Sequence, residues 1–279
     1  HVPSFVIKPA VRDLITDLFD RLVSAHGEQL VRAALAYITL TKNGVSETEL
    51  NHVLSLEDGV LADVYEWWVP PVRIVPPLLV TRLLTDLAPY LTRRGDGSGA
   101  ELVSWYHRQF WEAAQAWLFE GHEGIRELRH AELADYFSGA WSGKDKPYQD
   151  TLKKCVQRPE FFPGESGADR MVPHQPLELA GKLFGGAGAE ACQINTRRVH
   201  ELVHHLIEGG QEHCAVQELM SPGYIGAKFA LGEGAELMRE YAAAIQQFPD
   251  AAANLRRCKA TVGVYLAALK CHPPLLALQ

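Results

Sequence analysis

One stretch of the sequence, residues 76–119, restricts the possible folds of this chain more than any other. It starts with aliphatic residues at the spacing of one helical face, namely Leu79, Leu83, Leu84, Leu87 and Leu91. Residues 93–99 follow, with the glycines and charges expected of a turn between two extended segments. Residues 102–106 suit a short strand, and the apolar residues after them again have helical spacing, namely Phe110, Ala113, Ala114, Trp117 and Leu118.

A helix, a wing and a second helix that opens at His107 are typical of the last half of a winged-helix domain. The first half would precede them, because amphipathic helices are predicted over residues 10–24 and 28–41. Ser46 stands three residues before Glu49, a spacing that predicts a capping box at the start of the next short helix.

Most of the remaining chain is predicted to be helical, over residues 56–68 (capped near Ser55), 122–138, 195–208, 211–220, 225–248 (one long helix or a broken pair) and 250–270. Residues 139–147 indicate a linker. The predicted fold class is mainly α, with a winged-helix domain and its small β wing followed by an α-helical arm or α-solenoid-like bundle. The predicted domains are a leading helix over 1–25, the winged-helix domain over 26–145 and the helical arm over 146–279.

Composition limits the possible surroundings of the chain. No apolar run approaches the about 20 residues needed to cross a bilayer, so no membrane partner is expected. The first residues lack a signal-peptide pattern, and the sequence is expected to be the middle of a longer polypeptide. The five cysteines are odd in number and widely spread, which fits a reducing, cytoplasmic location better than a disulfide framework. A net charge of -7 is a poor match to nucleic acid.

Several stretches together resemble a known family. The chain is similar to the winged-helix and following helical region of NACHT-type STAND nucleotide switches, especially the NACHT and WD-repeat proteins and the nephrocystin-like proteins. The stretches that carry the resemblance are residues 30–38, 43–50, 76–79, 105–110, 133–137 and 198–206.

The resemblance implies a role in a nucleotide switch. In STAND proteins a P-loop ATPase core binds ADP or ATP with magnesium, a winged helix folds over the nucleotide, and a helical arm leads to a repeat sensor. A histidine of the winged helix contacts the ADP phosphate, and His107 lies at the matching place. Tyr106 and Arg108 flank it here, where the plant proteins have Met-His-Asp. The implied partners are an ATPase core before this segment and a repeat domain or protein partner after it.

The ATPase machinery itself is missing from the sequence, because no Gly-x-x-x-x-Gly-Lys-Ser/Thr motif occurs. The chain is therefore expected to hold no ADP, ATP or magnesium alone and to be no enzyme by itself, although it could form part of an ATPase. The function expected is that of a regulatory and interaction fragment.

Two alternatives to the switch stay open. The first is a purely structural helical scaffold in a large assembly. The second is a nucleic-acid-binding winged helix, which would need a basic recognition helix. The helix predicted after Pro77 carries Arg82 and Asp86 but little other charge, and Arg93 and Arg94 form the only basic pair at the wing.

The histidines allow a structural interpretation beside the functional one. His107 could simply be a partly buried residue that caps its own helix rather than one that contacts a phosphate. His200, His204 and His205, with His213 and Cys214 nearby, invite a zinc hypothesis. No Cys-x-x-Cys or second compact pair completes the set of ligands, so no metal site is expected.

Overall fold

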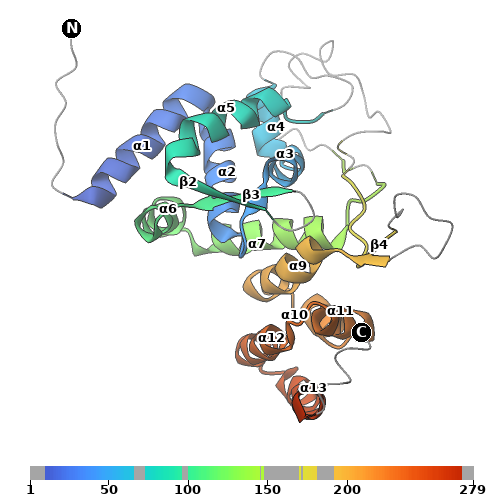
Figure 1. Ribbon diagram of the computed structural model, residues 1–279. Helices are drawn as coiled ribbons and strands as arrows, with labels where there is room; N and C mark the ends of the chain where they lie inside the picture. Colours follow the sequence, from blue (N-terminus) through green and yellow to red (C-terminus); the bar gives the residue numbers. More distant parts are fainter. Residues whose placement is uncertain are drawn as a thin grey trace, which may run out of the picture. The chain divides into compact units, whose positions relative to one another are not determined.

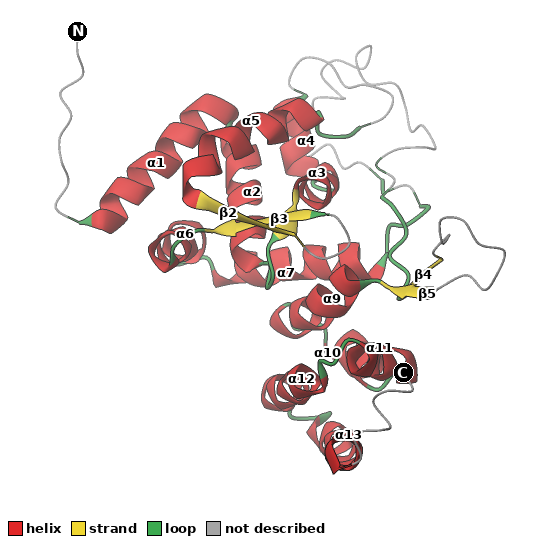
Figure 2. Cartoon of the chain, viewed as in Figure 1, coloured by secondary structure: helices red, strands yellow, loops and turns green. Residues whose placement is uncertain are grey.

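The computed structural model describes residues 10–65, 73–95, 100–144, 146–147, 170, 172–180 and 192–271. The chain divides into two compact units, and each is described by itself below. The N-terminal unit comprises His1–Arg129 and Trp141–Pro173, and the C-terminal unit comprises His130–Ala140 and His174–Gln279. The predicted domain ranges stay predictions. The expected mainly α class is confirmed, with few strands among many helices (Figure 2).

The N-terminal unit combines helices with a small antiparallel sheet (Figure 1). Strand β3 lies between β1 and β2 in this sheet, and Val45 on β1 faces Val103 on β3. The elements are α1 (Val11–His26), α2 (Glu28–Leu40), β1 (Val45–Ser46), α3 (Glu47–Ser55), α4 (Asp58–Val64), α5 (Pro77–Leu87), a 3-10 turn (Ala88–Tyr90), β2 (Leu91–Gly95), β3 (Glu101–Trp105), α6 (Arg108–Phe119) and α7 (Glu123–Ser138), whose last residues belong to the C-terminal unit.

The predicted capping box is present at the start of α3. The Ser46 hydroxyl oxygen accepts the Glu49 N–H at 3.1 Å, and the Glu49 carboxylate accepts the Ser46 N–H at 2.8 Å. These bonds satisfy two backbone donors that a helix start would otherwise leave unpaired. The helices predicted from residues 10 and 28 are also confirmed as α1 and α2.

Gly44 allows the chain to pass from α2 into β1. Its φ is +89°, and a Cβ atom there would lie 2.6 Å from the Val103 carbonyl oxygen. We expect Gly44→Ala to destabilise the N-terminal unit by about 2 kcal/mol or more, because it adds a clash to the cost of a left-handed backbone. Urea unfolding followed by tryptophan fluorescence measures the effect. Gly59→Ala is the matched control, since its Cβ would meet only the Gln29 side chain at 3.8 Å. Equal stability of the two variants would contradict the prediction.

Two sequence-based predictions about this unit were wrong. Leu91 was assigned to a helix and residues 93–95 to a turn, but all of them lie in β2, where Leu91 pairs with Trp105. Helix α5 ends at Leu87, and a 3-10 turn that contains Pro89 leads from it into β2. The wing residues 96–99 lie outside the described residues.

The helix predicted over 56–68 is the shorter α4, and Ser55 does not cap it. Instead, the Ser55 hydroxyl donates to the Asn51 carbonyl at 2.6 Å and accepts the Val75 N–H at 2.9 Å. The Ser55 hydroxyl therefore links α3 to the segment before α5. The end of the predicted helix, including Trp67 and Trp68, lies outside the described residues.

In the C-terminal unit, each helix from α9 onward packs on the next helix along the chain (Figure 1). A two-stranded antiparallel ribbon precedes these helices, and the sequence did not predict it. A turn at Leu231–Glu233 divides residues 225–248 into two helices, which is the broken pair that the sequence allowed. The helices predicted over 195–208, 211–220 and 250–270 are confirmed. The elements are β4 (Glu178–Ala180), β5 (Cys192–Ile194), α9 (Thr196–Glu208), α10 (Glu212–Leu219), α11 (Pro222–Ala230), α12 (Gly234–Gln247) and α13 (Ala252–Cys271).

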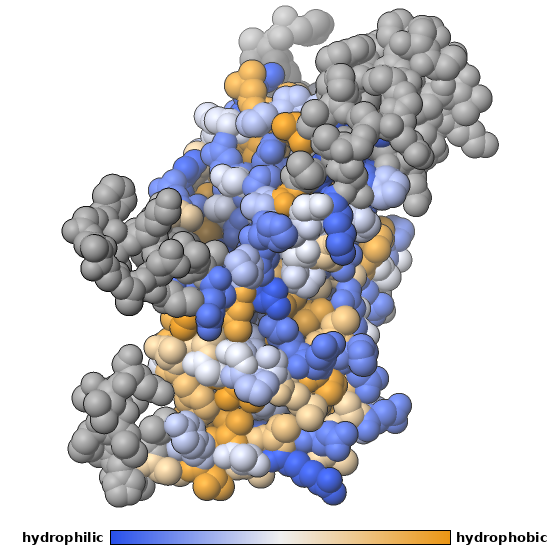
Figure 3. Space-filling model, turned by 90° about the vertical axis from the view of Figure 1, so that its right-hand side faces the viewer, coloured by the Kyte–Doolittle hydropathy of each residue, from blue (hydrophilic) through white to orange (hydrophobic). Residues whose placement is uncertain are grey.

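Hydrophobic and hydrophilic residues are mixed over the face of the molecule shown in Figure 3. On α13, the apolar side chains of Val264 and Tyr265 are exposed. Among the described helices, none combines the length and the apolar character that a bilayer span requires.

Candidate functional site

His107 lies where β3 passes into α6. The backbone enters through Tyr106, whose N–H donates to the Tyr90 carbonyl at 2.9 Å. His107 has an extended backbone with φ −133° and ψ 143°, the usual geometry of a residue that precedes a helix. Its Nδ1 accepts the Gln109 N–H at 3.2 Å. The ring therefore caps its own helix, as the structural interpretation of the sequence expected, but the side chain is exposed and not partly buried.

Because Nδ1 accepts the Gln109 N–H, the other ring nitrogen, Nε2, takes no part in the cap. A neutral imidazole that accepts at Nδ1 carries its hydrogen at Nε2, and the side chain of His107 is exposed. Tyr106 and Arg108 beside it are exposed as well, and Arg108 pairs with Glu112 at 2.7 Å. The first turn of α6 also directs backbone N–H groups and the positive end of the helix dipole outward. The junction can therefore donate hydrogen bonds to an anion that approaches it.

A cluster of aromatic side chains packs against the junction between β3 and α6. Phe19 on α1 is fully buried, with its ring centroid 5.9 Å from that of Trp105 and 5.4 Å from that of Trp117. The Trp105 indole stacks on Phe110 and donates to the Thr39 hydroxyl at 2.9 Å. These contacts hold the end of β3 and the start of α6 against α1 and α2, so the position of His107 is set by residues distant in sequence.

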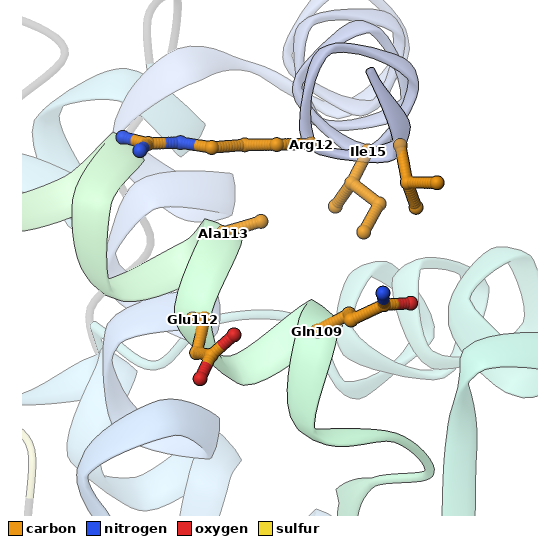
Figure 4. A pocket seen from close by; sticks show the side chains of 6 residues that line it. Arg12, Ile15, Gln109, Glu112 and Ala113 are labelled. Atoms are coloured by element: carbon orange, nitrogen blue, oxygen red, sulfur yellow. The ribbon is translucent and has the colours of Figure 1, made fainter.

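A pocket of about 400 Å³ lies between α1 and α6, close to this junction. Figure 4 shows Ile15 of α1 on the side toward Gln109 of α6, whereas the Arg12 side chain extends past Ala113 and the Glu112 carboxylate points away from α1. Arg12 pairs with Glu120 at 2.7 Å. Gln109 is also the residue whose N–H the His107 ring accepts. Among the described lining residues one side chain is basic and one is acidic, so these residues make a poor anion site by themselves.

Comparison with known proteins identifies relatives of the chain. The human NACHT domain- and WD repeat-containing protein 1 is 36% identical to the chain over 228 residues, which cover 80% of this chain and 13% of that protein. The human NACHT and WD repeat domain-containing protein 2 is 32% identical over 215 residues, which cover 72% of this chain and 12% of that protein. The chain is related to a region of the NACHT and WD repeat-containing proteins. The resemblance inferred from the sequence is thereby confirmed.

This NACHT-related chain spans only about an eighth of the length of those relatives, 12 to 13% in the two human proteins. The mouse counterpart of the first relative gives the same picture, at 36% identity over 203 residues. No protein-family profile and no solved structure matches the chain.

The structure separates the histidines that the sequence grouped together. His200 pairs with Glu233, and His213 is exposed on α10 beside the free, exposed thiol of Cys214. His204 and His205 instead meet His130, which the sequence analysis did not single out. No spacing rule could have found this group, because His130 and His205 are 75 residues apart in the sequence.

Proposed function

We propose that this chain is a regulatory region of a NACHT-type nucleotide switch. In this proposal the sheet and helices around α6 form a winged helix that closes over ADP or ATP. The nucleotide and its magnesium ion are held by a P-loop ATPase core outside this chain. The helical arm beyond it relays the nucleotide state to a WD-repeat domain or to another protein partner.

The observation that carries the proposal is the arrangement of His107. Its Nδ1 accepts the Gln109 N–H, which holds the ring at the start of α6 and leaves the Nε2–H of this exposed side chain outside the cap. A phosphate oxygen at this place would meet that donor together with the N-terminal end of α6. The residues present therefore fit contact with a phosphate group that another domain holds. Relationship to proteins with a NACHT domain supplies the candidate holder of the nucleotide.

The proposal also includes a location and excludes one class of partner. A reducing, cytoplasmic location agrees with the free thiols of Cys214 and Cys258. Binding to nucleic acid is not part of the proposal, since Arg93 of the basic pair in β2 is paired with Glu101 at 2.7 Å. A salt-dependent gel shift with a duplex would reveal it.

Two substitutions at His107 separate phosphate contact from helix capping. Serine is a good N-cap residue, so His107→Ser keeps the cap and removes the imidazole, whereas His107→Ala removes both. In the full-length NACHT protein we expect both variants to release bound ADP about tenfold faster or more, because a hydrogen bond to a charged group contributes about 1.5–3 kcal/mol. Release of a fluorescent ADP analogue measures the rate. Only His107→Ala should also lose about 1 kcal/mol of stability.

His122→Ser is the matched control, because His122 is another exposed histidine just before a helix, α7. Its ADP release should equal that of the unchanged protein. If His107→Ser retains ADP as long as the unchanged protein does, His107 is a helix cap alone and the proposed role is wrong.

A further inference from the structure

Three histidine rings converge inside the C-terminal unit. His130 lies on α7, and His204 and His205 are neighbours on α9. Each ring offers a nitrogen, and these three atoms all lie within 4.8 Å of one another. His130 and His205 are buried, and His204 is half-buried. The nitrogen of a neutral imidazole is the commonest metal ligand that proteins use, so the group has the composition of a metal site.

The backbone brings the two helices close enough for this convergence. At Gly209, which ends α9, a Cβ atom would lie 2.9 Å from the His205 carbonyl oxygen and 3.0 Å from the Ala131 nitrogen. The missing side chain therefore lets α9 end against the backbone of α7 next to His130. Phe137 of α7 stacks on the His205 ring, with centroids 6.0 Å apart and planes 5° apart. These contacts restrict the orientation of His205.

A buried carboxylate lies beside one ring nitrogen of His205, at a distance without hydrogen-bond geometry. Glu201 lies one turn before His205 on α9, and its Oε2 is 3.3 Å from His205 Nε2. Its other oxygen lies 3.3 Å from a guanidinium nitrogen of Arg197. A carboxylate in this place favours hydrogen on Nε2 and leaves Nδ1 as the lone-pair donor. That Nδ1 faces His130, whose Nδ1 lies 2.9 Å away. Proteins orient metal-binding histidines with such carboxylates.

We propose that His130, His204 and His205 bind a divalent transition-metal ion of the zinc type, with Glu201 as the residue that positions His205. Without the ion, His130 donates its Nδ1–H to His205 Nδ1. Binding moves that hydrogen to Nε2 of His130, so that both Nδ1 lone pairs face the ion and no net proton is lost. Tetrahedral zinc with bonds of about 2.05 Å needs ligands about 3.3 Å apart. The His130 and His205 Nδ1 atoms, 2.9 Å apart, would have to separate slightly, and the ligand atoms, which lie within 4.8 Å of one another, would have to adjust to that spacing. Three imidazoles leave the fourth position for water.

Cobalt(II) is the probe, because its visible absorption bands report tetrahedral coordination. We expect the metal-free chain to bind one Co²⁺ with visible bands that disappear when Zn²⁺ is added. His204→Gln should weaken Co²⁺ binding at least tenfold, and its half-buried position makes it the variant that keeps the fold. Glu201→Gln should weaken binding by about 10-fold to 100-fold while it preserves the shape of the side chain. Circular dichroism checks folding of each variant.

His213→Gln is the control for adventitious binding, since His213 is exposed beside the Cys214 thiol. It should leave the Co²⁺ affinity and bands unchanged. The proposal is overturned if the unchanged chain gives no bands with one equivalent of Co²⁺. It is equally overturned if His204→Gln binds as well as the unchanged chain, or if His213→Gln is the variant that loses binding.

Discussion

Replacement of Phe19 by alanine is expected to lower the free energy of unfolding of the N-terminal unit by about 3–5 kcal/mol. The Phe19 side chain is fully buried, and its ring contacts Trp105 and Trp117. Alanine would leave a cavity that only partial collapse of these large rings could fill. Because Trp105 precedes His107 by two residues, the same change should also loosen the start of α6. Urea unfolding followed by tryptophan fluorescence measures the loss.

Val11→Ala on the same helix is the matched control. Val11 is 53% exposed, so its truncation removes little buried surface and should cost less than about 1 kcal/mol. Similar losses for Phe19→Ala and Val11→Ala would show that the aromatic cluster does not hold α1 against α6. The structural explanation for the position of His107 would then be wrong.

The second large effect is expected in the C-terminal unit, at the buried Lys228. Its Nζ donates to Glu240 at 2.8 Å and to Glu233 at 3.1 Å. Burial and the adjacent Glu240 carboxylate raise the pKa of the Tyr224 hydroxyl far above its ordinary value, so Tyr224 stays a donor to Glu240 at 2.8 Å. Lys228→Met keeps an unbranched side chain, one atom shorter, but leaves buried carboxylate charge without its cation. We expect a loss of about 3–5 kcal/mol in chemical unfolding followed by circular dichroism.

The double variant Lys228→Met with Glu240→Gln tests the cause of that loss. Glutamine removes the uncompensated charge and keeps an oxygen that accepts from Tyr224. The double variant should therefore be more stable than Lys228→Met alone, which is the non-additivity expected of an ion pair. If the double variant is less stable than the single one, the pair does not act as a compensated charge pair.

Local signals in the sequence predicted much of the helical structure. The pair Ser46 and Glu49 predicted a capping box, and both hydrogen bonds are present. Such a motif needs only residues three apart, so its outcome depends little on the rest of the fold. Asn195 and Gly209 likewise lie at the two ends of α9, where the sequence placed a helix.

The errors lie where distant residues decide the structure. Leu91 continues the spacing of the preceding leucines, but pairing with Trp105 on β3 places it in a strand. The pairing of β1 with β3 joins residues about 60 positions apart along the chain, and periodicity carries no information about such contacts.

At the candidate site, too, local features could be predicted from the sequence and those set by distant residues could not. The sequence placed His107 at the start of a helix, and the structure has it as the N-cap of α6. The exposure of its ring depends on how β3 and α6 pack, and the sequence could not give that. Convergence of His130 with His204 and His205 depends on the close approach of α9 to α7, which only the folded backbone reveals.

The central claim is that His107 contacts a phosphate bound by a neighbouring ATPase core. A structure of the full-length, ADP-bound NACHT protein by electron cryo-microscopy tests it most directly. We expect His107 Nε2 about 2.7–3.2 Å from a phosphate oxygen of ADP, with Nδ1 still accepting the Gln109 N–H. An ADP-bound structure in which the His107 ring faces solvent or another protein surface, away from the phosphates, would contradict it.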